Sequence, residues 1–211
     1  MNEPIFILRG DICYSRNLTE LAVMKQGYVI CKEGVSLGVC QELPGEYQNL
    51  PIRDCGEDLI LPGLCDLHVH APQYTFRGLG MDLELLDWLN EHTFPEEGKY
   101  QDLEYARKAY GDFVHNLKES ATTRACIFGT IHVPATELLM DMLEASGLHT
   151  MVGKVNMDRN CPAYLIEKSA DISAEDTVEW IKDCKKRYQI TRPILTPRFI
   201  PSCSDALMEN L

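Results

Sequence analysis

The stretch LPGLCDLHVHAPQY, residues 61–74, combines an apolar run with a closely spaced histidine pair. The apolar run predicts a buried strand, and residues two apart along a strand point to the same face of a sheet. His68 and His70 can therefore reach one ion while Val69 packs on the opposite face. Two imidazoles suit zinc, although a catalytic zinc normally takes a third protein ligand and keeps a position open for water. The alternative is that the two histidines are simply a polar strand end without a metal. The apolar run that precedes them favours the metal site over this alternative.

From this stretch onward the sequence alternates between strand patterns and amphipathic helix patterns. Further strands are expected over residues 123–129, 149–155 and 194–200. Helices are expected after Asp82 as N-cap, over 103–117, over 136–146 with Gly147 as a left-handed cap, from a capping box at Ser173 through Tyr188, and from Ser204. Such alternation implies a parallel sheet. Four strands amount to the first half of a (β/α)8 barrel, in which the chemistry lies at the carboxyl ends of the strands.

The first sixty residues have a different pattern, with short alternating strands separated by glycine-containing turns. Strands are expected over 5–9, 28–31 and 35–40, and only a weak helical period occurs, around 17–24. This pattern is typical of a small antiparallel sheet or sandwich. We therefore predict two regions: a β-rich, sandwich-like region over 1–60 and the first half of a TIM-like barrel over 61–211.

Composition excludes several classes of partner. The 211 residues include 20 basic and 32 acidic side chains, giving a net charge of −12, which disfavours nucleic acid and anionic membranes as partners. No basic leader and no long apolar span occurs, so we expect neither secretion nor membrane insertion. The nine cysteines are scattered singly without a C-x-x-C motif. Reduced thiols in a cytoplasmic protein are the simplest interpretation.

Six segments carry a resemblance to a known family. They lie at residues 62–74, 77–89, 93–97, 128–132, 154–160 and 195–204. On these segments the chain resembles the N-terminal portion of the guanine deaminases, within the amidohydrolase superfamily. The segment with the histidine pair is general to the superfamily, whereas the last three are particular to guanine deaminases. The resemblance implies a zinc-dependent reaction that converts guanine and water to xanthine and ammonia, in a protein that forms a homodimer at full length.

The resemblance also implies roles for individual residues. His68 and His70 match the two zinc ligands on the first barrel strand of the family. Its substrate-binding positions are matched by His70, Ala71, Pro72, Gln73, Arg198 and Phe199. The remaining metal ligands and the proton-transfer residues of the family come from later strands. The catalytic residues are therefore expected beyond Leu211 and cannot be named.

The chemistry of three of these side chains agrees with purine recognition. The amide of Gln73 offers both a donor and an acceptor, and Arg198 offers a fixed fork of donors to carbonyl and imine acceptors. Phe199 offers a flat apolar face for stacking. Neighbouring strand residues point to opposite faces, so Arg198 and Phe199 share a pocket only if the strand has ended or bulged there. Without the resemblance, a salt bridge for Arg198 and a core position for Phe199 would be preferred.

Two alternative functions remain open at this point. One is another aminohydrolase of the superfamily, with a pyrimidine or triazine substrate; the segment containing Arg198 and Phe199 favours guanine over these. The other is a catalytically inert truncated chain or interaction fragment, because half a barrel exposes two strand edges and an unfinished core.

Overall fold

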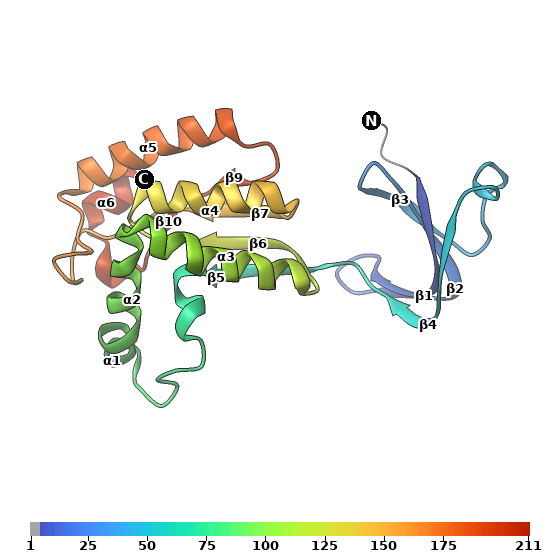
Figure 1. Ribbon diagram of the computed structural model, residues 1–211, viewed down its shortest axis with the longest axis horizontal. Helices are drawn as coiled ribbons and strands as arrows, with labels where there is room; N and C mark the ends of the chain where they lie inside the picture. The colour runs from blue at the N-terminus through green and yellow to red at the C-terminus, as the bar shows by residue number, and fades with distance from the viewer. Residues whose placement is uncertain (1–4) are drawn as a thin grey trace. The chain divides into compact units, whose positions relative to one another are not determined.

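The computed structural model describes residues 5–211 and divides into two compact units, Met1–Pro62 and Gly63–Leu211 (Figure 1). In the first unit, one sheet has the strand order β3-β2-β1-β4. Its strands are β1 (Phe6–Ser15), β2 (Leu21–Lys32), β3 (Val35–Cys40) and β4 (Ile52–Ile60), with a short 3₁₀ helix, η1 (Gly45–Tyr47), before β4. The pairs β1–β2 and β2–β3 are antiparallel, whereas β4 runs parallel to β1.

The structure corrects the weak helical pattern around residues 17–24. Its second half, from Leu21, belongs to β2, where Ala22 pairs with Tyr14 and Met24 pairs with Ile12. Cross-strand pairing and burial decide the conformation of such a segment more than its local period does. The residues that the structure describes in this unit form a single sheet, without a second sandwich layer.

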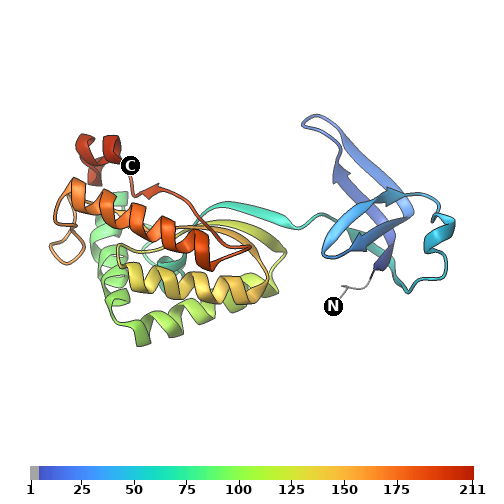
Figure 2. The same cartoon turned by 90° about the horizontal axis from the view of Figure 1, so that it is seen from above.

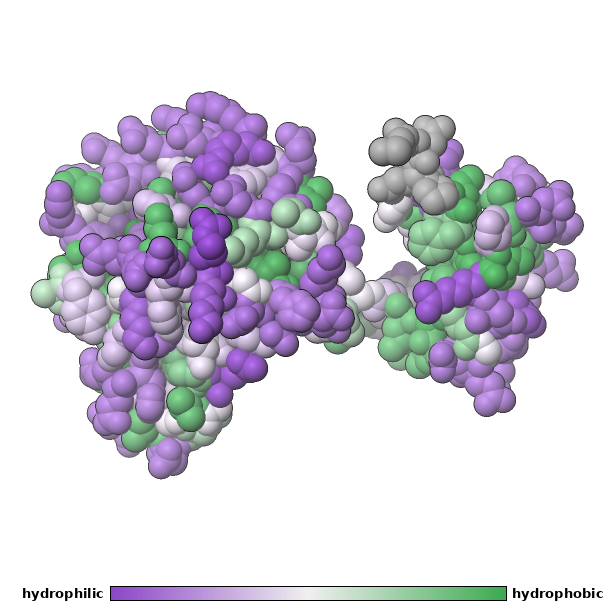
Figure 3. Space-filling view, viewed as in Figure 1, coloured by the Kyte–Doolittle hydropathy of each residue, from purple (hydrophilic) through white to green (hydrophobic). Residues whose placement is uncertain are grey.

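The sheet of the first unit leaves many large apolar side chains exposed. Its buried apolar residues are Ile7, Ile12, Ala22 and Ile30. The exposed ones include Phe6, Leu21, Val23, Val35, Leu37, Ile52 and Leu59, and green apolar patches lie on this unit in Figure 3. The core that this sheet forms by itself is therefore small.

The second unit is built on a parallel sheet with the strand order β5-β6-β7-β9. These strands are β5 (Leu64–His70), β6 (Thr122–Phe128), β7 (His149–Gly153) and β9 (Arg192–Pro193). A separate parallel pair joins β8 (Val155–Asn156) to β10 (Thr196–Pro197). The predicted strand over 194–200 is thus too long: within that range only β10 forms, and β9 lies just before the range, in the other sheet. Pro193 and Pro197 have no N–H with which to continue a hydrogen-bonded ladder.

Three long helices, α3 (Leu103–Glu119), α4 (Val133–Ser146) and α5 (Ala170–Arg187), pack on one face of this sheet (Figure 2). Their core with β6 and β7 includes Ala106, Tyr110, Phe113, Ile127, Leu139, Met140, Leu143, Val152, Trp180 and Cys184. The outward-facing side of α5 is hydrophilic in Figure 3. This alternation of strands and helices confirms the predicted α/β architecture. The packed core holds β5 and β6 in place, and their carboxyl ends carry the residues described below.

The ends of these helices follow local capping chemistry, with two corrections. Gly147 ends α4 with a positive φ of 82°, as predicted. However, α4 begins at Val133 rather than near Thr136, because Pro134 is accommodated in the first turn. The predicted capping box at Ser173 is wrong as well. The N-cap of α5 is Ser169, whose hydroxyl accepts from the Ile172 N–H at 3.2 Å.

Shorter helices complete the second unit. After β5 comes the 3₁₀ helix η2 (Ala71–Phe76), followed by a continuous helical run. This run consists of α1 (Leu85–Trp88), the π-turn η3 (Leu89–Thr93), α2 (Phe94–Gly98) and the 3₁₀ turn η4 (Lys99–Gln101). The N-cap position of α1 is Glu84, not Asp82. The chain ends with η5 (Ile200–Ser202) and α6 (Asp205–Asn210), which Ser204 caps as expected. None of the helices within residues 5–211 is long and apolar enough to cross a membrane.

One carboxylate on α4 holds the connection that leads into β9. Glu144 accepts hydrogen bonds from the N–H groups of Gln189, Ile190 and Thr191, at 2.8, 3.2 and 2.9 Å. These backbone donors keep the pKa of Glu144 below its usual value. A lowered carboxyl pKa contributes stability above the unfolded-state pKa of about 4.3, and this contribution disappears as the pH falls through the folded-state pKa.

We predict that Glu144→Gln lowers the free energy of unfolding by about 1–2 kcal/mol at pH 7, because a neutral amide accepts these hydrogen bonds less strongly. The difference between the variant and the unmodified chain should shrink from pH 7 towards pH 3, as the pH falls towards the lowered pKa of the carboxyl. Urea unfolding at both pH values measures this difference. An equal loss at pH 7 and pH 3 would contradict the assignment.

Candidate active site

The histidine pair lies at the carboxyl end of β5, at the edge of the sheet where the fold predicts chemistry. His68 and His70 point to the same face, and their ring centroids are 5.1 Å apart. Phe128, at the end of β6, pairs with His70 in the parallel register and stacks on its imidazole, with 4.4 Å between the ring centroids. The strand geometry and this aromatic contact together fix the two imidazoles close to each other.

His70 is held in its neutral form. Burial, the positive charge of Arg198 and the neighbouring His68 together lower the pKa of His70 to about 3. Its Nδ1 atom is buried and has no hydrogen-bond partner among the described residues. A neutral imidazole with an unused ring nitrogen is the form in which histidine binds a metal.

The pair therefore suits two positions of a zinc site, as the sequence predicts. Within residues 5–211 no group of three histidine, cysteine, aspartate or glutamate side chains comes close enough to hold an ion. A catalytic zinc takes three protein ligands and one open position. The described residues thus hold at most part of such a ligand set, and the nine cysteines in this range are free.

A pocket of about 680 Å³ opens beside the histidines. Of the residues predicted from the sequence, it is lined by His68, His70, Gln73, Arg198 and Phe199. Ala71 and Pro72 do not line it. Ala71 is fully buried in the core, and the Pro72 carbonyl accepts a hydrogen bond from the Tyr100 hydroxyl at 3.3 Å. We interpret these two residues as the support of the loop that carries Gln73.

The pocket wall opposite the polar groups is apolar. It comes from η2, the connection to α1, and the start of the helical run, with Phe76, Leu79, Met81, Leu85, Trp88 and Leu89 facing the space. Apolar walls with a few convergent polar groups are typical of pockets for small cyclic ligands. A flat aromatic base with polar edges matches this combination in chemistry.

Arg198 and Phe199 reach the same pocket because β10 ends at Pro197. The Arg198 N–H still donates to the Asn156 carbonyl at 3.2 Å, and Phe199 follows in an extended conformation. The alternation of side chains along a strand no longer applies beyond that point. The structure thus meets the condition under which the two neighbours can act on one ligand.

Glu97 on α2 also reaches this site, and the sequence patterns did not single it out. Its two carboxylate oxygens accept hydrogen bonds from Nη1 of Arg198, at 2.5 and 2.6 Å. Its Oε1 atom also accepts from Nε2 of Gln73 at 3.5 Å. Burial raises the pKa of Glu97, while the charge and hydrogen bonds of Arg198 oppose that rise. The salt bridge considered as an alternative for Arg198 is therefore present, and it lies next to the pocket.

The neighbouring carboxylate, Glu96, holds the same loop from another side. It accepts hydrogen bonds from the Thr75 hydroxyl at 2.7 Å, from the Lys99 ammonium at 2.6 Å and from the Tyr105 hydroxyl. It makes none with Gln73 or Arg198. Two adjacent glutamates typically indicate an exposed helix face, which is why no sequence signal separates these buried ones from solvated residues.

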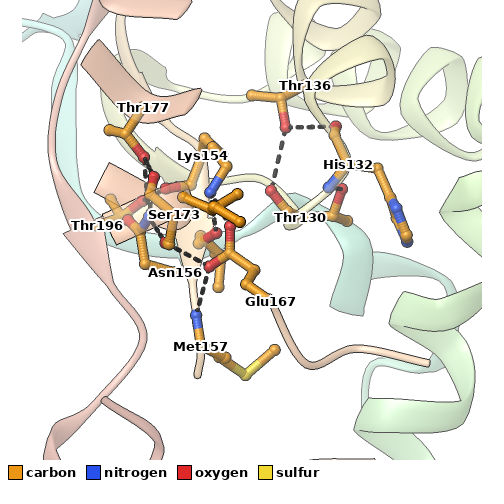
Figure 4. Close-up of polar contacts among 12 residues, drawn as sticks. Thr130, His132, Thr136, Lys154, Asn156, Met157, Glu167, Ser173, Thr177 and Thr196 are labelled. Atoms are coloured by element: carbon orange, nitrogen blue, oxygen red, sulfur yellow. Dashed lines mark hydrogen bonds and ion pairs between the residues drawn. The ribbon is translucent and has the colours of Figure 1, made fainter. Parts of the chain in front are cut away.

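A second buried ion pair supports β8 and the residues around it (Figure 4). Lys154, between β7 and β8, is only 1% exposed and pairs with Glu167. The other oxygen of Glu167 accepts from the Met157 N–H at 2.9 Å and from the Ser173 hydroxyl at 2.6 Å. Nδ2 of Asn156 donates to the same Ser173 hydroxyl at 2.7 Å. This network fixes β8, which in turn pairs with β10.

We predict that Lys154→Met lowers the free energy of unfolding by about 2–3 kcal/mol, because Glu167 loses its charge partner in a buried position. The loss should stay below the roughly 3–5 kcal/mol typical of breaking a buried pair, since two other donors still satisfy Glu167. Chemical unfolding at pH 7 measures it, with Lys186→Met on the exposed face of α5 as the matched control. A loss no larger than that of the control would show that the pair is not stabilising.

The comparisons with known proteins agree with this geometry. Residues 59–211 match the model of the amidohydrolase family, so the chain belongs to that family. Guanine deaminase from Dictyostelium discoideum is 33% identical, over all of this chain and 50% of that protein. A crystal structure of guanine deaminase from C. acetobutylicum with guanine in its active site is 43% identical, with a TM-score of 0.92 over 98% of this chain and 49% of that one.

More distant structures share the fold. An atrazine chlorohydrolase from Arthrobacter aurescens TC1, complexed with zinc and atraton, aligns with a TM-score of 0.80 at 13% identity. The alignment covers 97% of this chain and 49% of the chlorohydrolase chain. The second unit is therefore part of an amidohydrolase barrel. The chain spans about half the length of the relatives that it matches.

Proposed function

We propose that this chain supplies the N-terminal half of a zinc-dependent guanine deaminase, which converts guanine and water to xanthine and ammonia. One observation carries the proposal: a single pocket brings the histidine pair together with Gln73, Arg198 and Phe199. The similarity to guanine deaminases, including one with guanine in its active site, supports the same substrate. Free thiols support a reducing compartment such as the cytoplasm, and the resemblance supports a homodimer.

The roles of the residues follow from their chemistry. His68 and His70 would hold zinc, with the remaining ligands to be sought in the part of the relatives that this chain does not match. When bound, zinc lowers the pKa of a coordinated water to near 7. Arg198 directs N–H donors at the carbonyl and ring-nitrogen acceptors of the base, and Gln73 contacts its polar edge. Phe199 and the apolar wall exclude water and orient the ring.

A deamination assay with added zinc tests this function in a chimera of residues 1–211 with the unmatched half of the C. acetobutylicum relative, because residues 1–211 hold only part of a ligand set. We expect xanthine, followed by its absorbance, and ammonia to form in equal amounts from guanine. Hydrolysis of an amino-triazine in preference to guanine, or an inactive chimera that is folded and zinc-loaded, would contradict the proposal.

A further inference from the structure

Glu97 is a buried group that contacts both Gln73 and Arg198, the polar residues of the proposed purine site. Its side chain is 1% exposed, and Arg198, its ion-pair partner, is almost as deeply buried at 4%. Gln73, the other partner of Glu97, lies in η2, directly after β5. It is therefore separated in the sequence from both α2 and β10. A single carboxylate thus connects two recognition groups from opposite ends of the unit.

The carboxylate determines which atoms of Gln73 remain available to a ligand. An ionised carboxylate only accepts hydrogen bonds, so the amide nitrogen of Gln73 must face Glu97. The amide carbonyl of Gln73 then points away from Glu97 as a free acceptor. Without that contact, the amide could rotate and present its donor side equally well.

The same carboxylate orients the guanidinium group. Both hydrogen bonds from Arg198 to Glu97 use Nη1. Within the described range these two are the hydrogen bonds of the Arg198 side chain, and Arg198 lines the pocket, so Nε and Nη2 are available as donors. The guanidinium therefore keeps two donor atoms for a ligand, in an orientation that Glu97 fixes. Burial on this scale allows little reorientation of either partner.

We propose that Glu97 is a positioning residue that sets the hydrogen-bonding pattern of the purine site, with an acceptor at Gln73 and a donor pair at Arg198. This inference rests on the proposed function. The pattern favours a base that presents a carbonyl acceptor to Arg198 and the adjoining ring N–H to Gln73. Guanine satisfies both requirements, whereas 2-aminopurine lacks the carbonyl and the adjoining N–H. Glu97 would thus contribute to the choice between oxopurines and other aminopurines without touching the substrate.

The test compares Glu97→Gln with Glu96→Gln in the zinc-loaded protein. Both variants replace a buried carboxylate on α2 by its amide, but only Glu97 contacts Gln73 and Arg198. For Glu97→Gln we expect the KM for guanine to rise about tenfold or more, the fold-change expected when about 1.4 kcal/mol of binding is lost. The preference for guanine over 2-aminopurine, measured as the ratio of the inhibition constant of 2-aminopurine to the KM for guanine, should fall by a similar factor. The kcat and the zinc content should change much less.

Glu96→Gln should lower the melting temperature while it keeps the wild-type preference. An unchanged preference in Glu97→Gln, or an equal change in both variants, would overturn the inference. If Glu97→Gln does not fold, Glu97→Asp serves instead, because it keeps the charge for Arg198 and withdraws the carboxylate from Gln73. A wild-type preference in Glu97→Asp would overturn the inference in that case. Wild-type protein without activity on guanine would instead show that the proposed function has failed.

Discussion

Replacement of His70 by alanine is expected to abolish guanine deamination and to reduce bound zinc to background. Changes to groups that merely support a metal ligand already cost about 10–100-fold in affinity or activity, so loss of a ligand itself should exceed that range. The neutral state of His70, with its pKa lowered to about 3, means that it needs no proton loss to bind a metal at pH 7. Zinc content by atomic absorption and initial rates of xanthine formation measure the two effects.

The control for this prediction is His115→Ala. His115 is exposed on α3 and does not line the pocket, so its removal should leave both zinc content and turnover near the values of the unmodified protein. Because the His70 imidazole packs on Phe128, circular dichroism should accompany the measurement to show that the fold survives. A folded His70→Ala protein with full zinc content would exclude His70 as a ligand.

Features encoded by short sequence patterns were predictable, and the fold is the best example. The alternation of strands and helices gave the parallel sheet because hydrophobic periodicity is a local property. The left-handed cap at Gly147 followed from the same kind of local chemistry. The spacing of His68 and His70 predicted a shared face, and the structure places both rings there. Their role as metal ligands remains a prediction.

Features that depend on distant contacts were not predictable. The partners Glu97 and Arg198 are 101 residues apart, and no local pattern connects them. Ser173 resembles a helix cap in sequence, but tertiary contacts place it inside α5, where its hydroxyl binds Glu167. The predicted strand over 194–200 is shortened to β10, which pairs with β8 instead of joining β9 beside β7, and no local pattern shows that pairing.

Removal of the Arg198 guanidinium should have the second large effect, because it affects stability and binding together. Arg198→Met leaves Glu97 charged and unpaired in a buried position, which typically costs about 3–5 kcal/mol. It also removes the donors that face the pocket, and a hydrogen bond from a charged group is worth about 1.5–3 kcal/mol. We therefore expect the affinity for guanine to fall by at least about tenfold. Urea unfolding and equilibrium binding of guanine measure the two losses.

A double variant separates these two losses. Arg198→Met combined with Glu97→Gln removes both charges, so no unpaired carboxylate remains and much of the stability should return. Guanine affinity should not return, because the donors of Arg198 are still absent from the pocket. Arg192→Met, an exposed arginine on β9, controls for the loss of a positive charge and should affect neither property. Recovery of guanine affinity in the double variant would mean that Arg198 serves only as the partner of Glu97, and that the purine is recognised by other groups.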